Sequence, residues 1–199
     1  NLKKQCYISE VKSVLSEFAQ YGVDFERLDD FMKEVPPESY LHYKLDDIRT
    51  IYEKFEEYLS EKYITKEEML DVLSDAVPYS DILKGSVVAM DGFTGFTPVQ
   101  NRLIGELFSV CEKVMITVTM DGRENPYVYE HPYQIFALGK QMVTSLMKIA
   151  GEKKTEIEEP ICLFERPVYR FRDCSEMAFL ETELFRYSGA KYNGSCESA

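Results

Sequence analysis

The chain has 199 residues, 45% of them hydrophobic, so it can form a folded core and is not a disordered tail. Its 35 Asp and Glu outnumber its 23 Lys and Arg, and the net charge of −12 disfavours stand-alone nucleic-acid binding. The five cysteines are scattered without a C-x-x-C pair, which favours a reducing compartment and argues against a zinc site. The sequence has neither an apolar run of about 18 residues nor a signal-peptide pattern. We therefore expect a cytoplasmic protein without a membrane partner.

The first 78 residues show only helical patterns. The first apolar stripe runs from Ile8 to Phe18 and is predicted to end at Gly22, which suits a left-handed helix cap. Asp24 is predicted to cap a second helix, which must end before Pro36. Two more helices are predicted, one with the stripe Leu45, Ile48, Tyr52, Phe55 and Leu59, and one opened by a capping box of Thr65 and Glu68, with Met69, Leu70 and Leu73 on its apolar face.

The pattern changes after residue 84. Short apolar runs at residues 86–90 and 114–120, each followed by an Asp, predict parallel strands that are buried on both faces. A helix from Thr97 to Cys111 lies between them, which makes a βαβ unit. The remaining predictions are a helix at 132–150 that stops at Gly151, an extended segment at 168–171, and a last helix at 175–187 opened by a capping box of Asp173 and Glu176.

One segment, residues 87–100 with the sequence V-V-A-M-D-G-F-T-G-F-T-P-V-Q, carries most of the functional information. Asp91 follows the first strand, at the edge where α/β sheets bind ligands, and in P-loop NTPases an Asp in this place holds Mg²⁺. Nucleotide hydrolysis also normally needs a second carboxylate beside it to orient water. The next residue here is Gly92, so that carboxylate is missing.

This segment resembles the second motif of superfamily 1 DNA helicases, in the form D-G-F-T-G-F-T-P that is characteristic of the AddB (RexB) subunit of bacterial AddAB helicase–nucleases. Three other stretches, residues 9–22, 44–59 and 170–187, occur in the order expected of that subunit. The resemblance covers most of the chain and is strongest between residues 44 and 121.

The resemblance assigns roles position by position against the helicase pattern D-E-x-Q-D-(any four)-Q. Asp91 falls on the Mg²⁺-associated Asp, and Gly92 falls on the catalytic Glu, which is absent. Thr94 falls on the first Gln and Gly95 on the second Asp. Gln100 falls on the final Gln. The resemblance therefore implies a nucleotide-associated set of Asp91, Thr94 and Gln100, together with Asp121 from the next motif.

That next motif follows the second strand, where active helicases have G-D-x-x-Q. Asp121 matches its Asp, but Met120 replaces the Gly and Glu124 replaces the Gln that senses the γ-phosphate. The departures in both motifs imply a helicase-like domain that has lost its motor function. In the family, such a domain is associated with scanning single-stranded DNA for the recombination hotspot Chi. We predict no catalytic residue and no metal ligand in this chain.

The resemblance implies an α/β fold in two parts. Residues 1–80 would form an all-helical subdomain, and residues 81–199 would form part of a helicase-like parallel β-sheet domain of the P-loop NTPase type with flanking helices. The sequence lacks a G-x-x-x-x-G-K-[ST] loop and a cysteine quartet for the family's iron–sulfur domain. We therefore expect an internal piece of a longer protein, inactive and without a cofactor by itself. ATP, Mg²⁺ and an iron–sulfur cluster are implied only for the longer protein, with an AddA-type subunit and DNA as partners.

Several of these residues have a structural alternative. Asp91-Gly92 and Asp121-Gly122 are dipeptides typical of turns, and Gln100 can form a capping box with Thr97. Phe93 and Phe96 are predicted to be buried anchors of the loop.

A small basic cluster and a group of tyrosines are the candidates for DNA contacts. Arg166, Arg170 and Arg172 can contact phosphates, although a solvated strand face explains them equally well. The candidates for stacking on bases are Tyr127, Tyr129 and Tyr133. For these tyrosines, packing in the core or at a helix entry is the favoured alternative.

The leading function is a motor-inactive region of the B subunit of an ATP-dependent DNA helicase/deoxyribonuclease, which processes DNA ends in double-strand-break repair and recombination. One alternative is a nucleotide-binding switch that uses Asp91. Another is a non-enzymatic interaction scaffold whose acidic helical half docks to a basic partner.

Overall fold

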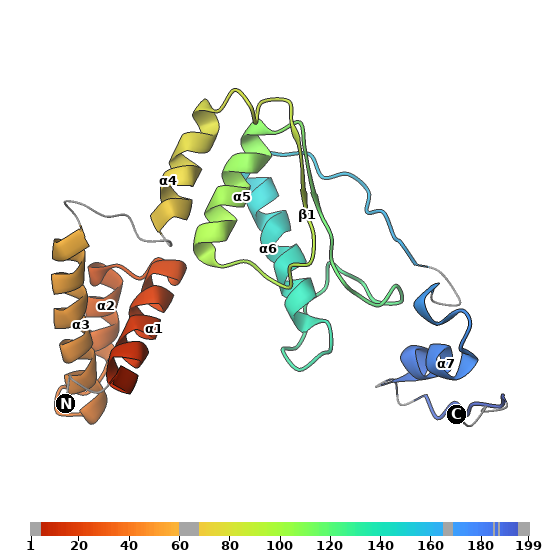
Figure 1. The fold of residues 1–199 in the computed structure, drawn as a ribbon, viewed down its shortest axis with the longest axis horizontal. Coiled ribbons are helices and arrows are strands. Elements are labelled where there is room, and N and C mark those ends of the chain that lie inside the picture. The colour runs from red at the N-terminus through yellow and green to blue at the C-terminus, as the bar shows by residue number, and fades with distance from the viewer. Residues whose placement is uncertain (1–4, 60–67, 165–168, 185, 187, 195–199) are drawn as a thin grey trace. The chain divides into compact units, whose positions relative to one another are not determined.

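A computed structural model describes residues 5–59, 68–164, 169–184, 186 and 188–194. The chain divides into two compact units, residues 1–157 and 158–199, and we describe each by itself. The first unit contains α1 (Gln5–Tyr21), α2 (Phe25–Glu34), α3 (Tyr40–Leu59), α4 (Glu68–Ala76), η1 (Val77–Tyr79), β1 (Val87–Met90), α5 (Pro98–Val110), β2 (Lys113–Ile116) and α6 (Ala137–Lys153) (Figure 1). The second contains η2 (Tyr169–Phe171) and α7 (Ser175–Glu183). The first unit contains the whole predicted helical subdomain, residues 1–80, and the predicted α/β domain up to residue 157. The domain boundary at residue 80 therefore stays a prediction.

The ends of the first two helices lie where the local signals predict them. Gly22 has a φ of +61° and its N–H donates to the Ala19 carbonyl at 3.2 Å, which ends α1. The Asp24 carboxylate accepts a hydrogen bond from the Arg27 N–H at 2.9 Å and caps α2. Val35 is extended, and α2 ends at the preceding residue.

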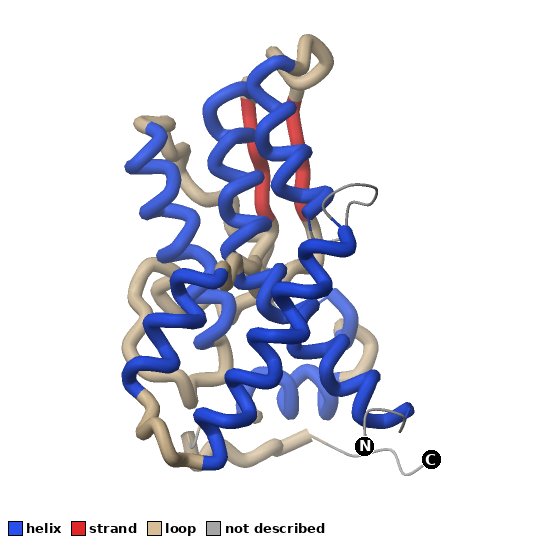
Figure 2. The backbone as a smooth tube through the Cα atoms, turned by 90° about the vertical axis from the view of Figure 1, so that its left-hand side faces the viewer, coloured by secondary structure: helices blue, strands red, loops and turns tan. Residues whose placement is uncertain are grey.

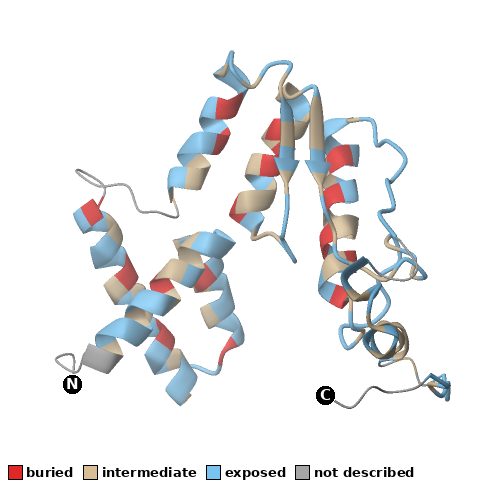
Figure 3. Ribbon diagram, turned by 45° about the vertical axis from the view of Figure 1, so that its right-hand side comes forward, coloured by how far each residue is buried: buried red, intermediate tan, exposed pale blue. Residues whose placement is uncertain are grey.

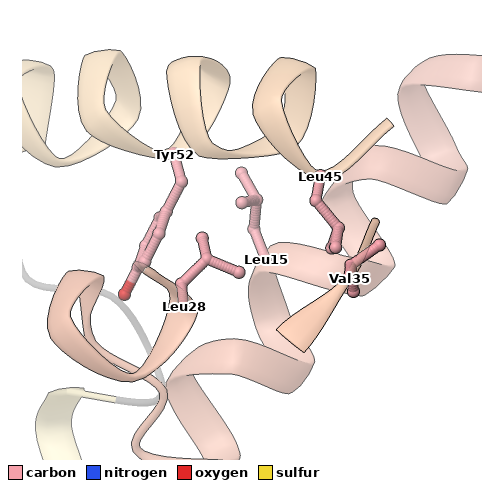
Figure 4. Close-up of a cluster of buried hydrophobic side chains, with 5 residues drawn as sticks. All are labelled: Leu15, Leu28, Val35, Leu45 and Tyr52. Carbon is pink, nitrogen blue, oxygen red and sulfur yellow. The ribbon is translucent and has the colours of Figure 1, made fainter. Parts of the chain in front are cut away.

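The helices α1, α2 and α3 share one apolar core. Tyr52 of α3 lies in it, and its hydroxyl donates to the Val23 carbonyl at 3.2 Å, so burial leaves this polar group satisfied. Burial raises the pKa of Tyr52 above its ordinary value. Phe55, predicted on the same stripe, is exposed. The buried residues of the cluster, drawn in Figure 4, are Leu15, Leu28, Val35, Leu45 and Tyr52.

Helix α4 presents a different face from the one that its apolar spacing predicts. Met69 and Leu73 are exposed, whereas Ser74 is buried, with its hydroxyl donating to the Leu70 carbonyl at 2.7 Å. The face turned to α5 also carries carboxylates. Arg102 of α5 pairs with Asp71 at 2.6 Å and with Asp75. The predicted capping residue, Thr65, lies outside the described residues.

The two strands form a parallel sheet with α5 between them in the chain, which confirms the βαβ unit. Their register pairs Val87 with Lys113 and Met90 with Ile116. Figure 2 shows the strands lying side by side. The fold is therefore helix-rich α/β with a small parallel sheet.

Only one face of this sheet is covered among the described residues. Ile104 of α5 and Met142 of α6 pack against the side chains that point to that face, such as Met90. On the other face Val87 is 55% exposed and Met115 is 46% exposed. The prediction of strands buried on both faces is therefore wrong here, because α5 and α6 both pack on the same face. Figure 3 shows intermediate and exposed positions, but no buried ones, along both strands.

Helix α6 is shifted toward the C-terminus relative to its prediction. It begins at Ala137 instead of residue 132, because residues 131–136 form turns in which Gln134 N–H donates to the His131 carbonyl at 3.3 Å. It also continues past Gly151, and Lys154 takes the left-handed cap with a φ of 56°.

No described helix combines the length and apolar character that a membrane crossing requires.

The second unit departs from two predictions. Residues 169–171 form a 3-10 helix instead of an extended segment, and residue 168 lies outside the described residues. Helix α7 begins after Cys174, without a side-chain cap, and ends at Glu183. The capping box of Asp173 and Glu176 is wrong, because the Asp173 carboxylate pairs with Arg172 at 3.4 Å and Glu176 accepts a hydrogen bond from the Ser175 hydroxyl at 3.5 Å.

Candidate functional site

The candidate nucleotide edge lies at the carboxyl ends of the two strands. Asp91 directly follows β1, Thr117 directly follows β2, and the Thr117 hydroxyl donates a hydrogen bond to the Asp91 carboxylate. The Thr117 N–H also donates to the Met90 carbonyl at 3.0 Å, which extends the pairing beyond the strands. Because side chains alternate along a strand, both residues lie on the face that α5 and α6 leave open.

Gly92 occupies the place that the resemblance assigns to a catalytic Glu, and its backbone has a φ of +80°. Glycine adopts this left-handed conformation without strain, whereas other residues do so at a cost. A Cβ added at Gly92 would have no atom within 4 Å, so there is space for a side chain. The positive φ is therefore the reason why glycine is favoured at this position.

The loop after Gly92 is partly anchored in the core. The Phe93 and Phe96 rings lie 5.0 Å apart between centroids, and Phe96 packs against the cluster of Ile104. Phe93 is exposed, so the prediction of a buried anchor is wrong for this residue. Thr94 is also exposed. The loop therefore offers Phe93 and Thr94 to solvent and is held by Phe96.

Gln100 forms the predicted capping box with Thr97. The Thr97 N–H donates to Gln100 Oε1 at 2.9 Å, and the Gln100 N–H donates to Thr97 Oγ1 at 3.4 Å. The reciprocal pair satisfies two backbone N–H groups at the first turn of α5. The side chain of Gln100 is thus engaged in holding the helix start.

The residues after β2 form an ion-paired turn. The Asp121 carboxylate accepts from the Arg123 backbone N–H at 2.8 Å and pairs with the guanidinium at 2.9 Å. Glu124 pairs with Lys140 of α6 at 2.7 Å, and the Lys140 side chain is only 7% exposed. Glu124, which replaces the γ-phosphate sensor in the resemblance, therefore links this turn to α6.

The described residues do not fit a complete Mg²⁺–ATP site. Asp91 accepts a hydrogen bond from Thr117, Gln100 pairs with Thr97 and Asp121 pairs with Arg123, so three of the four candidates have a partner outside the candidate set, and Thr94 is exposed. Across residues 5–59, 68–164 and the described parts of 169–194, no three His, Cys, Asp or Glu side chains are grouped to hold a metal ion.

The loop between β2 and α6 carries three exposed tyrosines. We name residues 125–136 the tyrosine loop. Tyr127, Tyr129 and Tyr133 are all exposed, so the predicted packing in the core is wrong for them. The Tyr133 ring stacks on His131 with centroids 5.0 Å apart and an interplanar angle of 10°. All three rings are therefore partly exposed in the part of the chain that the structure describes.

The basic candidates lie in the second unit. Arg170 lies over the Phe171 ring at 5.5 Å, and Arg172 lies over the Tyr169 ring at 4.6 Å. Both arginines are exposed. Arg166 lies outside the described residues.

Two residues with structural roles at this edge, Thr117 and Lys140, were not predicted from the sequence. Thr117 lies in the run of residues 114–120 that was predicted to be one buried strand. In the structure β2 ends at Ile116, which pairs with Met90, so the residues that follow the two strands, Thr117 and Asp91, lie side by side. Lys140 lies three residues after the buried Ala137 on α6, so helical spacing indicates a buried lysine that needs a carboxylate.

Comparison with known proteins agrees with the sequence resemblance. The family model described as "ADDB, N-terminal" matches residues 1–181. The B subunit of the ATP-dependent helicase/deoxyribonuclease of Lachnoclostridium phytofermentans is 38% identical over 191 residues, which cover 94% of this chain and 16% of that protein. The proteins of the same name from Thermoanaerobacter sp. and Clostridium acetobutylicum are 35% and 32% identical, each over 93% of this chain and 16% of their own length. The chain thus spans about a sixth of these relatives, and it belongs to the AddB N-terminal family.

Proposed function

We propose that this chain is a helicase-like region without motor activity, from the B subunit of a cytoplasmic ATP-dependent helicase/deoxyribonuclease. The family match and the names of the relatives support the parent enzyme. The parent would process DNA ends in double-strand-break repair and recombination, and this region would contribute to scanning single-stranded DNA for Chi. An AddA-type subunit would supply the ATP-driven motor.

The observation that carries the proposal is the backbone of Gly92. At the place of the water-orienting Glu the chain has a glycine with a φ of +80°. The preceding carboxylate, Asp91, is engaged by Thr117. Loss of the motor is therefore supported by the loop conformation as well as by the missing carboxylate.

The open sheet supports a larger helicase-like domain in the longer protein. Parallel sheets are normally covered on both faces, and a two-stranded sheet is marginal by itself. Val87 and Met115 are apolar residues on the open face. We propose that other segments of the longer protein cover this face and extend the sheet.

Affinity for Mg²⁺–ATP tests the scaffold against a nucleotide switch. The experiment compares the longer B subunit with its Asp91→Ala variant by isothermal titration, with Asp81→Ala as a control that removes an exposed carboxylate elsewhere. A scaffold predicts equal ATP affinity in all three proteins. Weaker binding by about tenfold in Asp91→Ala alone would contradict it and favour the switch.

A further inference from the structure

We draw no further inference here: the strongest candidate, the exposed surface patch of the tyrosine loop between β2 and α6, carries none because nothing among the residues that the structure describes shows what covers it in the longer protein.

Discussion

The Thr117 hydroxyl, one residue beyond β2, donates a hydrogen bond to the Asp91 carboxylate, one residue beyond β1. The parallel register pairs Met90 with Ile116, so Asp91 and Thr117 form the next pair along the strands. Asp91 thereby links two strand ends, a structural role that requires no nucleotide.

Gly92→Ala is expected to destabilise the chain by about 1 kcal/mol, because alanine resists the left-handed backbone at this position. Gly95→Ala is the matched control. Gly95 is three residues away, does not have a positive φ, and has no atom within 4 Å of an added Cβ. Urea unfolding of the two variants measures the difference. Equal midpoints would contradict the assigned backbone conformation.

The same conformation predicts that Gly92→Glu does not create an ATPase in the longer B subunit. The new carboxylate would start from a strained backbone, beside an Asp91 that Thr117 already engages. DNA-stimulated phosphate release is the measurement. Turnover well above that of the wild type would show that the missing carboxylate is the only defect.

Glu124→Gln is expected to cost about 1.5–3 kcal/mol in unfolding free energy, because it leaves the Lys140 ammonium buried without its charged partner. Glu152→Gln on α6, the helix that carries Lys140, is the control and should change stability little, since the Lys148–Glu152 pair is exposed and 3.9 Å long. The double variant Glu124→Leu/Lys140→Met should recover most of the loss. No recovery would mean that the ion pair is not the source of the effect.

The hydrogen bond between Asp29 and Arg49 predicts that the free energy of unfolding decreases at acid pH. Arg49 Nε donates to the Asp29 carboxylate at 2.5 Å, and this hydrogen bond holds the pKa of Asp29 below its ordinary value. A lowered pKa in the folded state gives stability that is present above the unfolded value of about 3.9 and is lost as the pH falls through the folded value.

The wild type should therefore exceed Asp29→Asn in urea midpoint at neutral pH, and the gap should close as the pH falls below about 4. Asp47→Asn removes the same charge from an exposed position of α3 and should stay close to the wild type. A gap between wild type and Asp29→Asn that does not change with pH would contradict the pairing with Arg49.

Arg170 and Arg172 remain the described candidates for DNA phosphates. If both contact phosphates, Arg170→Ala/Arg172→Ala should weaken binding of a labelled oligothymidine and reduce its salt slope by about 1.4. Fluorescence anisotropy at low and at physiological salt measures both. The control Lys84→Ala/Lys148→Ala removes two exposed charges from the first unit and should not change the slope. An unchanged slope in the arginine variant would remove these residues from the DNA path.

Short-range signals predicted the end of α1, the start and end of α2, the start of α5 and the βαβ unit. The caps at Gly22 and Asp24 and the box of Thr97 with Gln100 depend on hydrogen bonds within a few residues, which the sequence displays directly. The cap of α7 was mispredicted, because the Asp173 carboxylate expected to cap it pairs with Arg172 instead, and both ends of α6 lie C-terminal to their predicted positions.

Properties that depend on tertiary contacts were not predictable in this way. Apolar spacing gives the same pattern whether a face is covered or open, so Met115 and Leu73 appear buried from the sequence and are exposed in the structure. The pairs Asp91–Thr117 and Glu124–Lys140 join residues 26 and 16 positions apart, and their formation depends on the strand register and on where α6 begins.

Steady-state ATP hydrolysis by the two-subunit complex tests the loss of motor function most directly. The complex combines the longer B subunit, either wild type or Asp91→Ala, with an A-type subunit whose phosphate-binding loop is disabled. We expect no DNA-stimulated turnover with either form of the complex, because Asp91 and Gly92 do not supply the hydrolytic pair. Turnover in the wild type that disappears in Asp91→Ala would contradict this and identify the longer protein as a working motor.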